Sequence, residues 1–185
     1  MNKKLIFIVG ETGAGKDTVA DRLHYNKVIS YKTGPMRDTD IQGVTHNFIS
    51  DTEMDLLETR DDLIAYTKIG NIRYCATPDQ LYDDVMIYII NPDGVEWFEQ
   101  NYKKEDIDTF SICLYAPLEV RRDRCKDRSD YNTMFDKRVA AEEEDHSRFR
   151  SSNKYDLFVE NDNLDETIWV IEDHLQKWFS RKWKQ

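Results

Sequence analysis

Apolar residues along this chain gather in short runs separated by segments of mixed character. Residues 5–9, 85–90, 110–115 and 155–159 are each rich in apolar or β-branched side chains. Runs of this length with little polar alternation are typical of strands buried on both faces of a parallel sheet. Residues 26–30 form a shorter candidate for a further strand.

Between these runs, apolar positions recur every three or four residues, as on one face of a helix. The clearest case is the segment 164–178, where Ile168, Ile171, Leu175 and Trp178 share a face. Helices are also predicted at 19–23, at 95–102, after Pro117 and at 137–148. Alternating strands and helices predict an α/β fold in three layers, with helices on both faces of a parallel sheet.

Residues 31–77 interrupt this alternation. Residues 52–59 predict a short helix, and the segments 63–66 and 72–75 flank Ile69-Gly70-Asn71, which predicts a hairpin. We therefore expect a small β-rich insert in an otherwise single domain, because 185 residues suit one compact unit.

Composition disfavours nucleic-acid binding, membrane association and a role for the cysteines in metal binding. The formal net charge of −10 disfavours general nucleic-acid binding, which usually shows a basic face. No apolar run is long enough to span a membrane, so no membrane partner is expected. Cys75, Cys113 and Cys125 lack metal-ligand spacing and are typical of reduced thiols, which favours a cytoplasmic protein.

The chemistry is predicted from the stretch Gly10-Glu11-Thr12-Gly13-Ala14-Gly15-Lys16-Asp17-Thr18, between the first strand and its helix. Strand, glycine-rich turn and helix form the context of a phosphate-binding loop, or P-loop. Glycines allow backbone N–H groups to approach a ligand, and the helix N-terminus favours an anion. Lys16 adds a positive charge that can follow terminal phosphates.

The residue after the lysine departs from the common pattern, which places Ser or Thr there for the metal. Asp17 stands at that position and Thr18 follows it. Nucleotide monophosphate kinases often carry a Gly-Lys-X-Thr form, so Thr18 is the candidate for a phosphate or Mg²⁺ contact, and the role of Asp17 stays open. The alternative is a glycine-rich turn that binds nothing.

Further segments, in their order, resemble the guanylate kinase family. Residues 30–37 are similar to its Ser-X-Thr-Thr-Arg-X-X-Arg segment, with Ser30 and Arg37 at the ends. Residues 43–50 resemble Gly-X-X-Tyr-X-Phe-Val-Ser, and 70–77 its Gly-X-X-Tyr hairpin. Arg128 and the pair Lys137-Arg138 resemble the lid arginines, and residues 155–164 the closing Asp-X-Val-Ile-X-Asn-Asp-X-Leu.

Departures from the family concentrate in the acceptor site. The first family arginine is replaced by Gly34, with Lys32 as a candidate substitute, and a family tyrosine is replaced by His46. Ile64 and Ala65 fall where a glutamate reads the guanine edge. Loss of that carboxylate would relax or change base choice, because hydrogen-bond matching is what rejects wrong bases strongly.

The resemblance implies a P-loop NTPase type of fold with an acceptor-binding insert at 31–77 and a helical lid at 121–149, around a core of 1–30, 78–120 and 150–185. It implies ATP and Mg²⁺ as cofactors and small nucleotides as partners, in a monomer or homodimer. Catalytic residues would be Lys16, Arg128 and Arg138. The donor nucleotide would be bound by Gly10, Gly13, Ala14, Gly15, Lys16, Asp17, Thr18 and Asn161, with Thr18 toward the metal. The acceptor would be bound by Ser30, Arg37, His46, Tyr74 and Asp93.

The predicted reaction is ATP-dependent phosphorylation of a nucleoside or deoxynucleoside monophosphate, GMP or dGMP before others. Two alternatives stay open: a P-loop kinase of another small phosphorylated metabolite, and an inactive guanylate-kinase-like interaction module. Ordinary structural roles also stand beside the functional ones. Arg138 could pair with Glu142 at helical spacing, Tyr74 could be a packing aromatic and Asp93 a turn residue.

Overall fold

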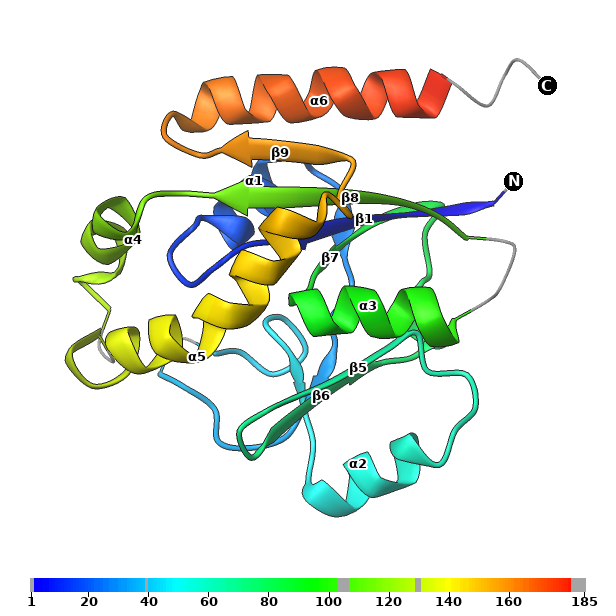
Figure 1. Cartoon of the computed structure of the whole chain (residues 1–185). Coiled ribbons are helices and arrows are strands. Elements are labelled where there is room, and N and C mark those ends of the chain that lie inside the picture. Colours follow the sequence, from blue (N-terminus) through cyan, green and yellow to red (C-terminus); the bar gives the residue numbers. More distant parts are fainter. Residues whose placement is uncertain (1, 39, 103–106, 129–130, 181–185) are drawn as a thin grey trace.

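A five-stranded sheet with the order β2-β7-β1-β8-β9 forms the centre of the fold (Figure 1). The computed structural model describes residues 2–38, 40–102, 107–128 and 131–180. All four strand pairings in this sheet are parallel. Its strands are β1 (Lys3–Val9), β2 (Asn26–Lys27), β7 (Val85–Ile89), β8 (Ile107–Tyr115) and β9 (Leu157–Glu160). The predicted parallel α/β sheet is confirmed.

Helices cover both faces of this sheet. Alternate residues of the central strand β1 point to opposite sides, and both sets are apolar, so each face needs a covering layer. Phe7 packs with Phe98 and Phe149 on one face, where α3 (Pro92–Asn101) and α5 (Tyr131–Ser152) lie. Ile8 packs with Val19 and Ile168 on the other, where α1 (Lys16–Arg22) and α6 (Leu164–Ser180) lie. The three expected layers therefore enclose two apolar cores.

Helix α3 begins earlier than the apolar spacing predicted. Asn91 is its N-cap and its side-chain oxygen accepts a hydrogen bond from the Gly94 N–H at 3.1 Å. Pro92 occupies the first turn, where its missing N–H costs nothing. The prediction of a start near Val95 missed this cap, because the apolar periodicity begins only one turn into the helix.

Residues 31–77 contain a second sheet, with the order β4-β3-β6-β5, and the helix α2 (Asp51–Glu58). Its strands are β3 (Tyr31–Lys32), β4 (Asn47–Phe48), β5 (Ala65–Ile69) and β6 (Ile72–Ala76). β5 and β6 pair antiparallel, as the predicted hairpin requires. Ser50 and Glu53 form a reciprocal capping box at the start of α2, which fixes where that helix begins.

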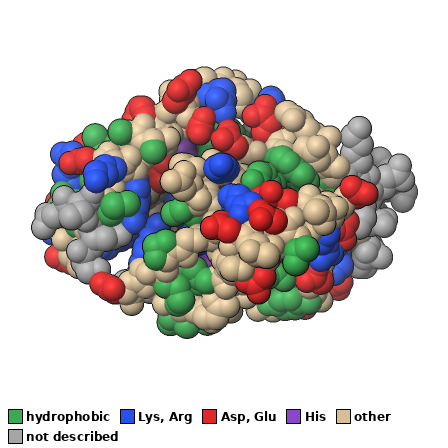
Figure 2. Space-filling view, turned by 90° about the horizontal axis from the view of Figure 1, so that it is seen from below, with side chains coloured by type: hydrophobic (Ala, Val, Ile, Leu, Met, Phe, Trp, Pro, Cys, Tyr) green, Lys and Arg blue, Asp and Glu red, His purple; other side chains and the backbone are tan. Residues whose placement is uncertain are grey.

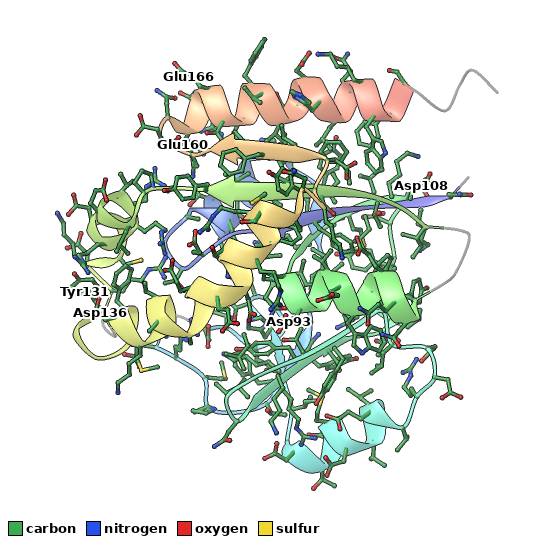
Figure 3. The ribbon with its side chains drawn as sticks, in the orientation of Figure 1. Asp93, Asp108, Tyr131, Asp136, Glu160 and Glu166 are labelled. Atoms are coloured by element: carbon green, nitrogen blue, oxygen red, sulfur yellow. The ribbon has the colours of Figure 1, made fainter. Side chains whose placement is uncertain are left out.

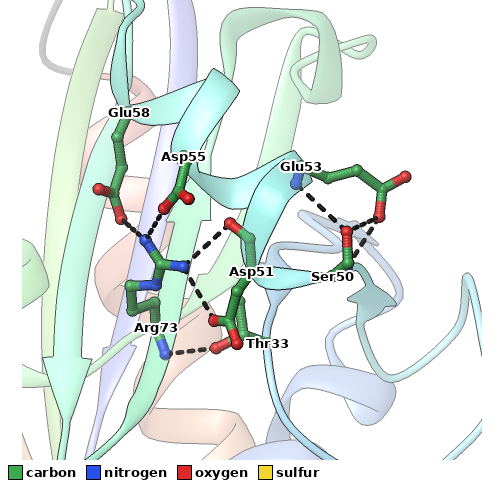
Figure 4. Close-up of polar contacts among 7 residues, drawn as sticks. All are labelled: Thr33, Ser50, Asp51, Glu53, Asp55, Glu58 and Arg73. Atoms are coloured by element: carbon green, nitrogen blue, oxygen red, sulfur yellow. Dashed lines mark hydrogen bonds and ion pairs between the residues drawn. The ribbon is translucent and has the colours of Figure 1, made fainter.

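Arg73 on β6 ties α2 to this second sheet (Figure 4). Its guanidinium lies 2.8 Å from Asp51, 2.6 Å from Asp55 and 2.9 Å from Glu58. Planar guanidinium groups can serve several carboxylates at once, which a lysine cannot do with fixed geometry. The arrangement holds α2 against the face of the sheet and leaves Arg73 committed to structure.

Of the lid arginines predicted from the sequence, Arg128 lies in the connection from α4 (Leu118–Cys125) to α5, and Arg138 lies in α5 itself. In the predicted polar stretch 129–133, residues 129 and 130 lie outside the described residues. Helix α5 then runs from Tyr131, at the left of Figure 3, to Ser152, with Asp136 in its second turn. Within the part of the chain that the structure describes, no helix is both long and apolar enough to cross a membrane.

Candidate active site

Residues 10–15 join the end of β1 to the start of α1, and residues 16–18 form the first turn of that helix (Figure 1). Gly13 and Gly15 take φ values of +85° and +95°, which side chains other than glycine rarely adopt. Gly15 is the N-cap of α1 and makes no side-chain cap. The first N–H groups of α1 therefore open toward solvent at the place where an anion is favoured.

These glycines are also required by close packing behind the loop. A Cβ at Gly10 would lie 2.5 Å from the Leu114 carbonyl oxygen, and one at Gly13 would lie 2.7 Å from that of Arg121. At Gly15 it would collide with the side-chain amide of Asn161. The loop is thus shaped as a tight backbone cradle, which fits the phosphates of a nucleotide.

Lys16 curls over this loop. Its ammonium donates to the carbonyl oxygens of Gly10 at 2.7 Å and Glu11 at 3.2 Å. Burial lowers the pKa of Lys16, while the nearby carboxylates of Glu142 and Asp17 act in the opposite direction. The lysine is therefore held beside the cradle in a position from which it can follow an incoming phosphate.

A buried carboxylate supports the loop from beneath. Glu11 is only 3% exposed and pairs with Arg121 of α4 at 3.4 Å and Arg150 of α5 at 2.9 Å. A charge removed from water in this way needs partners, and two guanidinium groups supply them. Glu11 therefore connects the loop to both helices that flank the cleft. The sequence gives no signal for these pairs, because the partners lie far along the chain.

The loop faces a cleft of about 550 Å³. Figure 2 shows Lys and Arg side chains bordering a hollow at the left of the view, on the side where α4 and α5 meet. The predicted site residues that line the cleft are Gly13, Gly15, Lys16, Asp17, Thr18, Ser30, Arg37, His46, Arg128 and Arg138. The fold therefore brings three chain segments, the loop, the insert and the lid, to one cavity.

An adjoining hollow of about 350 Å³ contains three more of the predicted residues, Gly10, Tyr74 and Asp93. It shares Lys16, Ser30, His46 and Glu142 with the cleft. The two spaces therefore meet at the lysine and at the residues predicted to hold the acceptor phosphate.

Two predicted donor-site residues lie behind the loop. Ala14 is fully buried, and its carbonyl accepts a hydrogen bond from the Asn161 side chain at 2.8 Å. Asn161 is itself only 3% exposed. The geometry gives Asn161 a bracing role. Its predicted contact with the donor nucleotide stays a prediction. The guanidinium of Arg124 donates a hydrogen bond to the Asn161 carbonyl at 2.7 Å.

His46 and Ser30, both predicted to bind the acceptor, lie where the cleft and the adjoining hollow meet. The Ser30 hydroxyl lies 3.1 Å from Nδ1 of His46, and the imidazole packs edge-on against Tyr74 and Phe48. Burial first, and the positive charge of Lys32 second, lower the pKa of His46 to about 4. The ring is therefore neutral at pH 7, and can serve an acceptor phosphate as a hydrogen-bond donor.

Lys32 is buried beneath this group, at 2% exposure. Its ammonium lies 3.5 Å from Asp40 and 4.9 Å from the centre of the Phe48 ring. Burial and the neighbouring Arg37 lower the pKa of Lys32. Lys32, the candidate substitute for the family arginine, is not among the residues that line the cleft. Its contacts with Asp40 and Phe48 give it a supporting position behind His46.

Asp93 stands at the start of α3, next to α5 (Figure 3). It pairs with Arg148 at 2.9 Å, and burial and the adjacent Asp145 raise its pKa. Arg148 also contacts Asp145 at 3.1 Å. Asp93 therefore lines the adjoining hollow of about 350 Å³, here called the acceptor-side hollow, while its carboxylate is paired with Arg148.

Thr67 is a site residue that the sequence did not single out. It lies on β5 in the acceptor-side hollow, and its hydroxyl oxygen accepts from the side-chain amide of Asn91 at 3.1 Å. Ile64, at the position aligned with the family glutamate, is fully buried in the apolar core. Strand alternation from Ile64 would have suggested that a later residue of β5 faces the hollow.

The fold and this cleft define a P-loop kinase. The family model for guanylate kinase matches residues 2–178, nearly the whole chain. The chain therefore belongs to the guanylate kinase family.

Known relatives agree with this assignment at low identity. The guanylate kinase of Sus scrofa is 23% identical, over 93% of this chain and 91% of its own length. That of Rickettsia prowazekii is 26% identical, over 93% of this chain and 90% of its own length. Among solved structures, guanylate kinase from Anaplasma phagocytophilum superposes with a TM-score of 0.71 at 18% identity, covering 98% of this chain and 88% of that one.

Proposed function

We propose that this protein transfers a phosphoryl group from ATP to a nucleoside monophosphate, with GMP or dGMP as the acceptor. The observation that carries the proposal is the convergence of Lys16, Arg37 and Arg138 on one cleft from three separate segments. Phosphoryl transfer mainly requires two anions to be positioned and the charge between them to be neutralised. A cleft that gathers cations in a chain of net charge −10 suits that task.

On the donor side, the cradle of Gly13 and Gly15 would hold the phosphates through backbone N–H groups. Lys16 would leave the carbonyls of the loop for the phosphate oxygens. Thr18 and Asp17 are exposed at the mouth of the cleft, next to the phosphate cradle. Their oxygens are of the kind that Mg²⁺ prefers, and the ion, when bound with ATP, neutralises charge on the transferring phosphate.

On the acceptor side, Ser30, Arg37 and His46 would bind the phosphate of the monophosphate. Arg37 is exposed at the cleft and supplies charge, while the buried Ser30 and the half-buried His46 supply hydrogen bonds. Tyr74 borders the adjoining hollow, where the nucleoside would lie. No general base is needed, because the attacking phosphate oxygen is already ionised.

The lid arginines complete the arrangement. Arg128 follows α4 and Arg138 lies in the second turn of α5, and both line the cleft. Closure of such cations on the transferring group excludes water and stabilises charge, as arginine fingers do in related chemistry, where they contribute about 10³–10⁵ in rate.

The named relatives are guanylate kinases, which favours guanine as the base. The hollow presents a neutral hydroxyl from Thr67 on β5 and a neutral amide from Asn91, the N-cap of α3. The carboxylates of Asp93 and Asp145 also line it. The amide oxygen of Asn91 is already used in capping α3, and one of its N–H groups in the bond to Thr67. Recognition of the base by these residues would be less selective than recognition by a buried carboxylate, because fewer of their hydrogen-bonding groups remain for the base.

A coupled assay of ADP release with ATP and Mg²⁺, run across ribo- and deoxynucleoside monophosphates, tests the proposal. We expect turnover with GMP and dGMP, and its loss by at least about 10³-fold in Lys16→Ala, since the lysine stabilises charge in the transition state. Unchanged melting of the variant would show that the fold survives. Turnover with another base only would revise the acceptor, and turnover with none would overturn the proposal.

A further inference from the structure

A carboxylate from the lid helix occupies the phosphate-binding loop. Glu142 of α5 accepts two hydrogen bonds from Thr12, one from its backbone N–H at 2.7 Å and one from its hydroxyl at 2.7 Å. One oxygen of the carboxylate serves each donor, so the contact is bidentate. The two residues are 130 positions apart in the chain, and the contact connects the loop to α5 at the wall of the cleft.

This contact uses a part of the loop suited to an anion. Thr12 lines the cleft beside Gly13, Gly15 and Lys16. An N–H and an O–H that converge on one carboxylate would serve the oxygens of a phosphate equally well. Glu142 therefore sits, with its negative charge, at a place where the terminal phosphates of a donor would come to lie.

Lys16 is also held by groups of the protein itself. The Lys16 ammonium is bonded to two loop carbonyls, and the charge of Glu142 is the largest of those that favour its protonated form. A bound polyphosphate would compete for Lys16 and would also repel Glu142, because two anions a few ångströms apart in a partly dry cleft interact by kilocalories per mole.

Glu142 is mounted on the same helix face as a lid arginine. Arg138 lies four residues before it, and both side chains line the cleft. Further along α5, Arg150 is anchored to the buried Glu11, and His146 bonds through Nδ1 to the Glu142 carbonyl. The helix thus carries both a group that repels the donor phosphates and one that attracts them.

We propose that Glu142 is a built-in competitor of the donor phosphates. In the nucleotide-free protein it holds Thr12 and keeps α5 on the loop, and a donor must displace it to bind. Glu142 thereby lowers the affinity for the donor, because binding of the donor breaks the contact between Glu142 and Thr12. This inference rests on the proposed function, because it takes a nucleotide triphosphate as the ligand of the loop.

Titration calorimetry with ATP and Mg²⁺, without acceptor, tests the inference in Glu142→Gln and Glu143→Gln. Both variants lose one negative charge from the same helix, and Glu143 is exposed on α5. We expect Glu142→Gln to bind ATP about tenfold more tightly, since a charged hydrogen-bonding partner is replaced by a neutral one. Glu143→Gln should stay within about twofold of the unmodified protein.

Equal ATP affinity in the two variants, or weaker binding by Glu142→Gln, would overturn the inference while leaving the proposed function in place. Failure of the unmodified protein to bind ATP would overturn the proposed function itself. A second readout is the amide resonance of Thr12 in the nucleotide-free protein. It should move in Glu142→Gln and not in Glu143→Gln, and an unmoved resonance would show that the contact is absent in solution.

Discussion

Asn161 holds the phosphate-binding loop through Ala14, with its side-chain amide donating to the Ala14 carbonyl at 2.8 Å. Asn161 follows β9 and Ala14 follows β1, so the bond joins the ends of two strands that are separated by β8. Both residues are buried, and the loop carbonyl has no solvent to replace the donor. The shape of the loop therefore depends on a residue from the far end of the chain.

Removal of this amide in Asn161→Ala should lower the free energy of unfolding by about 1–3 kcal/mol, because the buried Ala14 carbonyl keeps only a long contact of 3.5 Å with Arg124. It should also raise the KM for ATP, since the loop is loosened. The matched control is Asn163→Ala. Asn163 accepts from the N–H groups of Asp165 and Glu166 at the start of α6, so its loss should cost about 1 kcal/mol of stability. If both variants raised the KM for ATP equally, the bracing role would be wrong.

The buried carboxylate of Glu11 gives a prediction about stability. Glu11→Gln leaves Arg121, itself only 4% exposed, without its charged partner. Urea denaturation should show a loss of about 3 kcal/mol, the scale on which broken buried ion pairs are measured. Asp165→Asn removes the exposed pair with Arg22 and should cost less than about 1 kcal/mol. Equal losses would mean that Glu11 is not the electrostatic support of the loop.

His46 should make stability depend on pH between about 4 and 6.5. Its pKa falls from an ordinary value of 6.5 to about 4 in the folded protein. The unfolded chain therefore binds more protons than the folded one in this window, and the free energy of unfolding rises with pH there. The contribution is fully present above pH 6.5 and is lost as pH falls through 4.

Urea denaturation at several pH values checks this, with His46→Asn as the comparison. The variant should lose less stability than the unmodified protein on going from pH 6.5 to pH 4. Parallel curves would contradict the shift. A proton NMR titration, with the His46 signal assigned by its absence in the variant, should give a midpoint near 4. The midpoint should move upward when a monophosphate is bound, because a nearby anion favours the imidazolium.

The centre of the main sheet could be predicted from the sequence because its inner strands are largely buried on both faces. Val85 to Ile89 and Phe110 to Tyr115 are predominantly apolar, so composition indicates these strands, while the more polar start of β8 at Ile107 has no such signal. The N-terminus of α3 could not be placed as well, since it depends on the cap at Asn91 and on Pro92 rather than on apolar spacing. The short strands β3 and β4, of two residues each, exist through pairing with distant partners and have no signal of their own.

The loop of the candidate site was predictable, because its glycines, Lys16 and the flanking elements are contiguous in the chain. What was not predictable depends on contacts between remote segments. Glu11 meets its two arginines only after α4 and α5 have packed, and Glu142 pairs with Thr12 rather than acting only as a helical neighbour of Arg138. Thr67 lines the acceptor-side hollow because of the register of β5. Alternation from Ile64 indicates which residues share a face of the strand but not which of them meets Asn91.

The central claim is that donor and acceptor bind in one continuous cleft with their phosphates facing each other. The most direct test is calorimetric binding of adenosine and guanosine joined by five phosphates, a molecule long enough to occupy both sides. We predict one molecule bound per chain, with an affinity at least about 10²-fold above that of ATP or GMP alone, because the second contact becomes intramolecular. Binding no tighter than that of ATP would contradict the account, since the two sides would then not belong to one site.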